Sequence, residues 1–222
     1  MIDDFARFNY GEIIDALDIK NIEDFLFNAI RCKKLYLPVQ VAEITLRKRI
    51  NTILTSVYGN EWWLNKSIRF QNKQQEIIDS TIGSTKQNIF KRGDKHKSSV
   101  ELAFPSKEME IDFRKELISS FSFGFWVAML TRHYEPMWRR NKKRLFPNSP
   151  KGFEISNAHK NFKRILLLRN LIMHHKPILG ISLEEDESII LESVGWISPE
   201  VRKWLEHIML KTEVSIKTSL QE

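Results

Sequence analysis

Apolar residues recur at steps of three and four over much of the chain, which is the spacing of amphipathic helices. One such stripe begins at Ile22 and continues to Leu35. Pro38 can open a separate helix, because proline is tolerated in a first helical turn. A second stripe then continues to Val57 and stops at Gly59. We therefore predict two helices in this region, with a break between them just before Pro38.

Later in the chain the same spacing predicts three more helices, from Glu108 to Leu130, from Asn157 to His175 and from Val201 to Ile216. The stretch from Phe121 to Leu130 is almost wholly apolar, so we expect it in the core, with a place in a dimer interface as the alternative. Residues 66–98 are mostly polar and favour a solvent-facing helix followed by a loop near Gly93. Three prolines are expected to break the segment after residue 130 into short pieces: Pro136, Pro147 and Pro150.

The composition supports an all-α protein. The 222 residues include only 8 glycines and 7 prolines, so turns are few, and 42% hydrophobic residues suffice for a core. A single cysteine excludes an internal disulfide framework and a multi-cysteine zinc site. The acidic start of the chain does not have the form of a secretory signal, and no apolar run reaches the ~20 residues that span a bilayer. We expect one helical domain over residues 1–222, a cytoplasmic location and no membrane association.

The net charge of +7 is unevenly distributed along the chain. Residues 1–85 carry 11 basic and 11 acidic side chains, residues 86–176 carry 20 and 8, and residues 177–222 carry 4 and 9, so the three parts have charges of 0, +12 and −5. A solvated helix face explains such charge, and attraction to a polyanion such as RNA or DNA is the alternative. The basic residues are densest at Arg139, Arg140, Lys142, Lys143 and Arg144, with a looser group at Lys91, Arg92, Lys95 and Lys97.

One segment combines apolar spacing with chemically useful side chains. Steps of three and four from Phe162 lead to Arg169, which places this arginine on the apolar side of its helix. A guanidinium stays charged, so burying it requires a carboxylate partner or a bound anion. Asn170 and His174 lie one turn apart on a neighbouring face. His174 and His175 point about 100° apart and are poor joint ligands, so we expect no metal site.

Structural roles are the alternative for each of these residues. A histidine at a helix end can interact with the helix dipole. Arg169 can form an ion pair with Glu43, and Glu43 is also spaced to pair with Arg47 at i,i+4. The acidic run from Glu184 to Glu187 is explained by a loop or a helix start. Its alternative role is contact with the basic residues of a second subunit, which would restrain access of RNA.

The pattern of Arg169, Asn170 and His174 resembles the Arg-x(4–6)-His motif of HEPN domains (higher eukaryotes and prokaryotes nucleotide-binding). More closely, the chain resembles the bacterial Abi-like family of abortive-infection proteins. The family sequence Arg-Asn-Arg-x-x-His-His-Glu-Pro corresponds to Arg169-Asn-Leu-Ile-Met-His174-His175-Lys-Pro177. Two further matches precede it in the family's order: Glu43-Ile-Thr-Leu-Arg47 with Tyr58-Gly-Asn-Glu-Trp62-Trp63, and Phe121-Ser-Phe-Gly-Phe-Trp126 with Tyr134-Glu135, Trp138 and Phe146-Pro147.

This resemblance implies a HEPN-like helical bundle with additional helices that acts as a homodimer. The core would span about residues 38–178, with N-terminal helices over 1–37 and a C-terminal helical extension over 179–222. The implied activity is that of a metal-independent endoribonuclease, a toxin or effector of antiphage abortive infection. Its catalytic residues would be Arg169, Asn170 and His174, with His175 as the reserve candidate. The dense basic residues named above, together with Lys176, would bind RNA.

Metal-free cleavage of RNA needs a base for the 2′-hydroxyl, an acid for the 5′-oxygen and a cation for the phosphorane. Histidine suits both proton transfers because it ordinarily titrates near neutral pH, and Arg169 can supply the cation. One histidine does not readily serve as base and acid in the same step. A two-fold dimer that brings together two copies of Arg169 and His174 is therefore the predicted arrangement.

Two departures from the family sequence bear on this function. Leu171 stands where the family often has a second arginine, and Lys176 stands where it often has glutamate. The first removes a possible phosphate contact, and the second makes the site more basic, which favours RNA or marks a diverged site. The alternative is a non-catalytic HEPN-type module that binds RNA or a nucleotide, or that assembles with a partner protein. A DNA-binding regulator is disfavoured because no helix-turn-helix stands out in the basic region. We expect RNA as the partner, transfer RNA being one candidate, together with an antitoxin or regulatory protein, and no cofactor.

Overall fold

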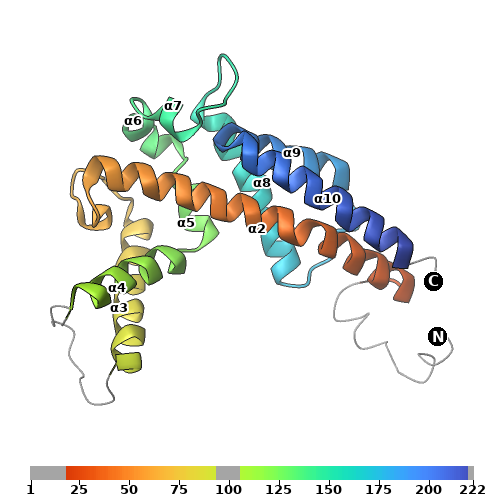
Figure 1. Cartoon of the computed structure of the whole chain (residues 1–222), viewed down its shortest axis with the longest axis horizontal. Helices are drawn as coiled ribbons and strands as arrows, with labels where there is room; N and C mark the ends of the chain where they lie inside the picture. Colours follow the sequence, from red (N-terminus) through yellow and green to blue (C-terminus); the bar gives the residue numbers. More distant parts are fainter. Residues whose placement is uncertain (1–18, 94–105, 220–222) are drawn as a thin grey trace. The chain divides into compact units, whose positions relative to one another are not determined.

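Amphipathic spacing produces helices throughout the part of the chain that the structure describes. The computed structural model describes residues 19–93 and 106–219, and side chains over 19–89 and 106–211. Within these ranges it contains helices and no strand, which confirms the all-α prediction there (Figure 1). None of the helices in these ranges has an apolar stretch long enough to cross a membrane. The start of the chain, the predicted loop after Gly93, Lys95 and Lys97 lie outside the described residues, as do the side chains of Lys91 and Arg92.

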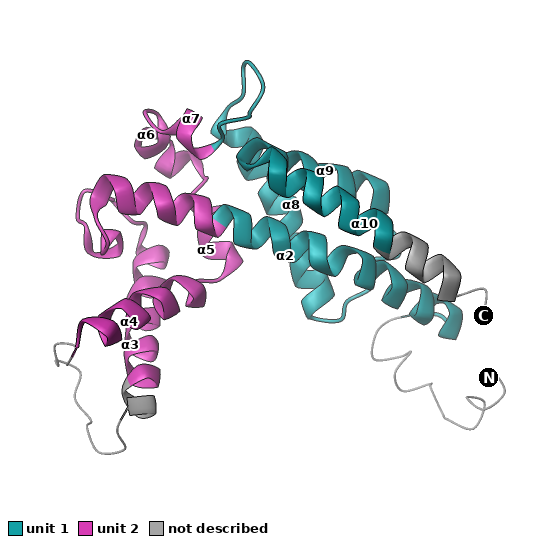
Figure 2. Ribbon diagram, in the orientation of Figure 1, with its two compact units in different colours: residues 1–46, 146–222 teal, residues 47–145 magenta. Residues whose placement is uncertain are grey.

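The chain forms two compact units, and helix α2 (Ile22–Tyr58) contributes to both (Figure 2). Unit 1 takes the described residues up to Leu46 and those from Phe146 onward, whereas unit 2 comprises Arg47–Leu145. The single domain expected over residues 1–222 stays a prediction.

Helix α2 corrects the prediction of two helices joined near Pro38. It is one continuous helix with Pro38 inside it. Proline removes one backbone donor and ordinarily disrupts a helix interior at a cost of ~3 kcal/mol, which is why the sequence indicated a break. Leu35, Val39 and Ala42 surround the proline and are almost completely buried. Burial of this apolar stripe offsets the lost hydrogen bond, because tertiary packing supplies most helix stability in proteins.

Unit 1 is built around the first part of α2 and three helices near the C-terminus. α9 packs against both α8 and α10. An aromatic cluster closes one end of this core, with the rings of Phe153 and Trp196 4.8 Å apart and Phe146 fully buried beside them. Ser182 caps α9 by accepting a hydrogen bond from the Glu185 N–H, so the acidic run is a helix start. The three helices are α8 (Ile155–Met173), α9 (Leu183–Ile197) and α10 (Pro199–Ser219).

Unit 2 is centred on Trp62, which has no exposed surface and donates a 2.9 Å hydrogen bond from Nε1 to Asn51 Oδ1. The rings of Phe121, Phe125 and Trp126 surround it within 6.4 Å, which confirms the expected core position of this apolar stretch. The helices of this unit beyond α2 are α3 (Asn72–Gly93), α4 (Lys107–Ser120), α5 (Phe123–Ala128), α6 (Glu135–Trp138) and α7 (Lys142–Leu145), with 3-10 turns η2 (Trp62–Leu64) and η3 (Arg132–Tyr134).

The single helix predicted from Glu108 to Leu130 is wrong. α4 ends at Ser120 because Phe121 has an extended backbone, and Ser122 then caps α5 by accepting a hydrogen bond from the Phe125 N–H. The apolar pattern continues across this break, so spacing alone did not reveal it. The short helical pieces expected around the prolines after residue 130 are confirmed.

Candidate functional site

The Arg169–His174 motif lies at the C-terminal end of α8 in unit 1. Helix α8 buries Ile155, Ala158, Phe162, Ile165, Leu168 and Ile172. This stripe passes through Leu168, so Arg169 lies at its edge with 34% of its side chain exposed. The placement corrects the sequence interpretation, which set Arg169 within the apolar stripe. About a third of the arginine side chain is therefore accessible to solvent, whereas its Nε atom is buried.

Glu43 of α2 is the carboxylate partner of Arg169. Arg169 Nε lies 3.6 Å from Glu43 Oε2, and the Glu43 side chain is only 17% exposed. This confirms the ion pair that the sequence suggested as the structural alternative. The buried Nε atom has no hydrogen-bond partner among the described residues, whereas Nη1 donates to Asn170 Oδ1 at 3.4 Å. Arg47, the other predicted partner of Glu43, donates a 3.0 Å hydrogen bond to the Ser119 carbonyl.

His174 is the C-cap of α8 and its side chain is exposed. The next two residues close the helix: the His175 N–H donates to the Ile172 carbonyl and the Lys176 N–H donates to the Leu171 carbonyl. These two bonds form a Schellman motif, which requires a left-handed residue at its turn. His175 occupies that position with a φ of 56°, where glycine is usual. His174 and His175 therefore have different backbone conformations.

Two hydrogen bonds from α2 hold the segment that follows the motif. The Ile178 N–H donates to Asn28 Oδ1 at 2.8 Å, and Asn28 is 6% exposed. Arg31 donates to the carbonyl of Ile181 and lies over the ring of Phe27. Sequence reasoning missed both, since the partners are 150 residues apart and no local pattern links them. The one signal in the sequence was the presence of the polar residues Asn28 and Arg31 in a predicted amphipathic helix.

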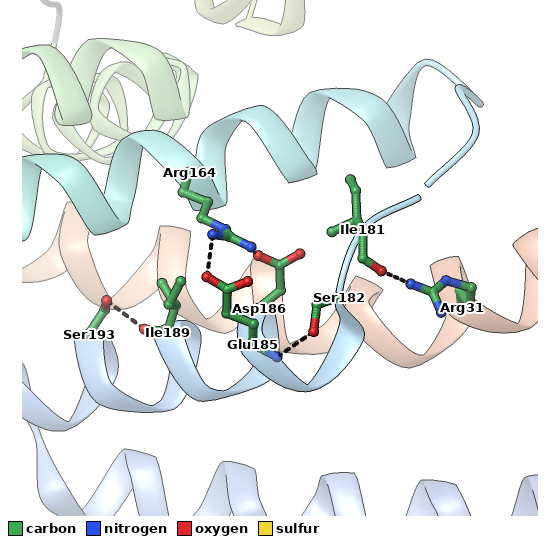
Figure 3. A network of polar contacts seen from close by, with 8 residues as sticks. All are labelled: Arg31, Arg164, Ile181, Ser182, Glu185, Asp186, Ile189 and Ser193. Carbon is green, nitrogen blue, oxygen red and sulfur yellow. Dashed lines mark hydrogen bonds and ion pairs between the residues drawn. The ribbon is translucent and has the colours of Figure 1, made fainter. Parts of the chain in front are cut away.

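A second arginine of α8 fastens this helix to α9. Arg164 donates from Nε to Asp186 Oδ1 at 2.6 Å and from Nη1 to Glu185 Oε1 at 2.7 Å. Figure 3 shows Arg164 reaching toward both carboxylates at the start of α9. These contacts raise the pKa of Arg164 further above its already high ordinary value. Asp186 is almost completely buried and its Oδ2 atom has no hydrogen-bond partner among the described residues, so it depends on this arginine.

The basic residues predicted to bind RNA belong to two different units. In unit 2, Arg144 donates to Ser56 Oγ and Asn141 Oδ1. Lys176, in unit 1, is exposed directly after the Arg169–His174 motif. RNA binding by all of these residues stays a prediction. The residues of unit 2 are Arg139, Arg140, Lys143 and Arg144, which are exposed, and Lys142, which is half-buried.

The arrangement at the end of α8 combines a cation, an amide and an imidazole on adjacent turns. Such a set can bind a phosphate group and transfer a proton. Over residues 19–89 and 106–211, no three histidine, cysteine, aspartate or glutamate side chains gather as metal ligands. Comparisons of this chain with protein families, curated proteins and solved structures found no significant match.

Proposed function

We propose that this protein is a metal-independent endoribonuclease of HEPN type that acts as a homodimer in abortive-infection defence. The observation that supports this proposal is the grouping at the end of α8. A partly exposed Arg169 is held by Glu43 and Asn170, and an exposed His174 follows one turn after Asn170. RNA offers a substrate that needs both groups, because its cleavage moves two protons and develops negative charge on phosphorus.

The proposed reaction begins with transfer of the 2′-hydroxyl proton to the neutral His174 imidazole of one subunit. The 2′-oxygen attacks phosphorus, and the bond between phosphorus and the 5′-oxygen breaks. The protonated His174 of the partner copy then donates its proton to the departing 5′-oxygen. The products are a 2′,3′-cyclic phosphate and a free 5′-hydroxyl. Arg169 stabilises the charge on the phosphorane oxygens, and Asn170 orients the guanidinium.

This mechanism constrains the dimer. Leu167, Leu171 and His174 follow one another at steps of four and three, so they share a face of α8, and 61% of Leu167 is exposed. Suppose that two copies of α8 pack antiparallel through this face. At ~1.5 Å per residue, a two-fold axis at Leu167 would place the two His174 residues ~20 Å apart, whereas an axis at Leu171 would place them ~9 Å apart. A shared active site therefore requires the axis near Leu171.

The proposal is tested by incubating the purified protein with total cellular RNA in EDTA and mapping the new ends. Wild type is expected to generate 2′,3′-cyclic phosphate ends, and His174→Ala is expected to generate none. Absence of cleavage by wild type, or equal cleavage by the variant, would reject the enzymatic function.

The alternative function is a non-catalytic module that binds RNA or assembles with a partner protein. The ion pair between Glu43 and Arg169 favours it, since an arginine with a purely structural role would have the same carboxylate partner. This alternative predicts RNA binding that weakens with salt and survives His174→Ala, without cleavage products.

A further inference from the structure

The cations of α8 differ in whether a carboxylate of a neighbouring helix engages them. Residues 155–173 contain no aspartate or glutamate. Arg164 is paired with Glu185 and Asp186, and Arg169 is paired with Glu43. Lys160 and Lys163 are exposed, and neither has an ion pair with any residue that the structure describes. Both arginines are therefore engaged by carboxylates of neighbouring helices, whereas both lysines are exposed to solvent.

The two lysines lie on the same side of α8 as His174, outside the part that the proposed dimer would cover. With the two-fold axis near Leu171, two antiparallel copies of α8 overlap only over residues 169–173. At 100° per residue, Lys160, Lys163, Leu167, Leu171 and His174 all fall within about 40° of one line along α8. Lys160 lies ~20 Å from His174 along the axis, since 14 steps separate them at ~1.5 Å each. A stacked nucleic-acid strand covers the same length in about six nucleotides at ~3.4 Å each. Lys176, also exposed, follows His174 by two residues, beyond the end of the helix.

The surroundings of Lys160 also favour a polar ligand. Lys160 borders a pocket of about 350 Å³ that Lys151, Asn157 and Asn161 also line. One carboxylate, that of Glu192, lines this pocket and accepts a 3.3 Å hydrogen bond from Asn161 Nδ2. The second lysine that lines the pocket, Lys151, is also exposed. The polar groups that line the pocket are therefore two ammonium groups, two side-chain amides and one carboxylate.

We propose that Lys160, Lys163 and Lys176 form a phosphate-binding track that guides single-stranded RNA along α8 to His174. This inference rests on the proposed function, because an RNA strand is the polyanion that the motif at the end of the track would cleave. One row of lysines matches one backbone, as in proteins that bind single strands. Leu167 is the one large apolar side chain that α8 exposes, and a membrane surface would need a broad apolar face instead.

The test measures binding separately from cleavage. All proteins carry His174→Ala, and binding of a labelled single-stranded RNA is measured over a series of salt concentrations. The double variant Lys160→Ala/Lys163→Ala is compared with Lys203→Ala/Lys211→Ala, which removes the same charge from exposed positions of α10. Circular dichroism checks that each protein folds. A third protein, Lys160→Arg/Lys163→Arg, keeps the charge of the track.

The α8 double alanine variant is expected to bind about tenfold more weakly and to lower the slope of log K against log salt by ~1.4, the value for two lost phosphate contacts on a single strand. The α10 control and the arginine variant are expected to match the parent protein. Three results would each overturn the proposed track: unchanged binding in the α8 variant, an equal loss of binding in the α10 control, or no RNA binding by the parent protein. So would tighter binding of the parent to anionic vesicles than to RNA. In each of these cases the proposed function would still hold if wild type cleaves RNA and His174→Ala does not.

Discussion

The Nε atom of Arg169 lies 3.6 Å from Oε2 of Glu43, so the two side chains form an ion pair in which Nε donates no hydrogen bond. The carboxylate fixes the guanidinium at the edge of the core, and about a third of the arginine side chain stays exposed. A phosphate that approaches the exposed part would therefore meet an arginine whose orientation is already set. Preorganised cations of this kind stabilise developing charge because they need little rearrangement during the reaction.

The Glu43–Arg169 pair is tested by a double-mutant cycle. Glu43→Gln keeps the shape of the side chain and removes its charge, and we expect a loss of about 1–2 kcal/mol in unfolding free energy because the pair is partly buried. Arg169→Met removes the other charge. Urea unfolding of both single variants and the double variant gives the coupling energy, which we expect to be at least ~0.5 kcal/mol. Additive effects of the two substitutions would show that the two charges do not interact.

His175 is expected to carry backbone strain. Its φ of 56° costs a non-glycine residue ~1–2 kcal/mol. Glycine avoids this cost, but it also loses more conformational entropy on folding, which cancels part of the gain in stability. His175→Gly is therefore expected to raise the unfolding free energy by about 1 kcal/mol, and His175→Val is expected to lower it. The same glycine variant tests the reserve catalytic role, since retained RNA cleavage would assign His175 to the helix end alone. Destabilisation by glycine would contradict the strained Schellman turn.

The arginine that joins α8 to α9 is expected to contribute more to stability than a surface ion pair. Arg164→Ala leaves the carboxylate of Asp186, which is 2% exposed, without its partner, so we expect a loss of about 3 kcal/mol. Glu185→Gln is the matched control, because 56% of the Glu185 side chain is exposed and such pairs contribute ~0–1 kcal/mol. Thermal and urea unfolding measure both. Equal losses in the two variants would show that burial of Asp186 does not set the energy.

His159 is expected to make the fold sensitive to acid. Burial, and then repulsion by Lys163, lower its pKa from the ordinary value of 6.5. The folded protein thus binds this proton more weakly than the unfolded chain, so stability falls as the pH drops through 6.5 toward the lowered folded value. His159→Gln is expected to flatten the dependence of unfolding free energy on pH over that window. An NMR titration of the imidazole gives the shift directly, and a pKa above 6.5 would contradict the account.

The local spacing of side chains predicted α8 but placed Arg169 within the apolar stripe, and the pairing of Arg169 with Glu43 was one of the alternatives that this placement suggested. Local spacing failed where distant packing decides the outcome. Pro38 is accommodated inside α2 because Leu35 and Val39 are buried around it, which depends on other helices. The break at Phe121 had a local signal that was overlooked, since Ser122 is a good N-cap residue. The contact of Asn28 with Ile178 joins residues 150 positions apart and had none.

The exposed lysines of α8 are a second feature that the sequence alone did not reveal. The sequence places Lys160 and Lys163 on one side of a helix, but only the structure shows that the arginines of that helix are engaged by carboxylates while these lysines are exposed. Counting charges had instead directed attention to the denser basic residues of unit 2. Density of charge along a chain does not distinguish paired from unpaired cations.

The central claim is that Arg169 and His174 cleave RNA, and the most direct measurement is the cleavage rate of one mapped RNA in EDTA. The rates of wild type, Arg169→Ala, His174→Ala and His207→Ala are compared, with His207 as an exposed histidine of α10 outside the site. We predict 2′,3′-cyclic phosphate ends from wild type and His207→Ala, and a loss of at least about 100-fold in the other two, as expected for removal of a general acid–base or of a charge-stabilising group. Equal rates for His174→Ala and His207→Ala would contradict the account.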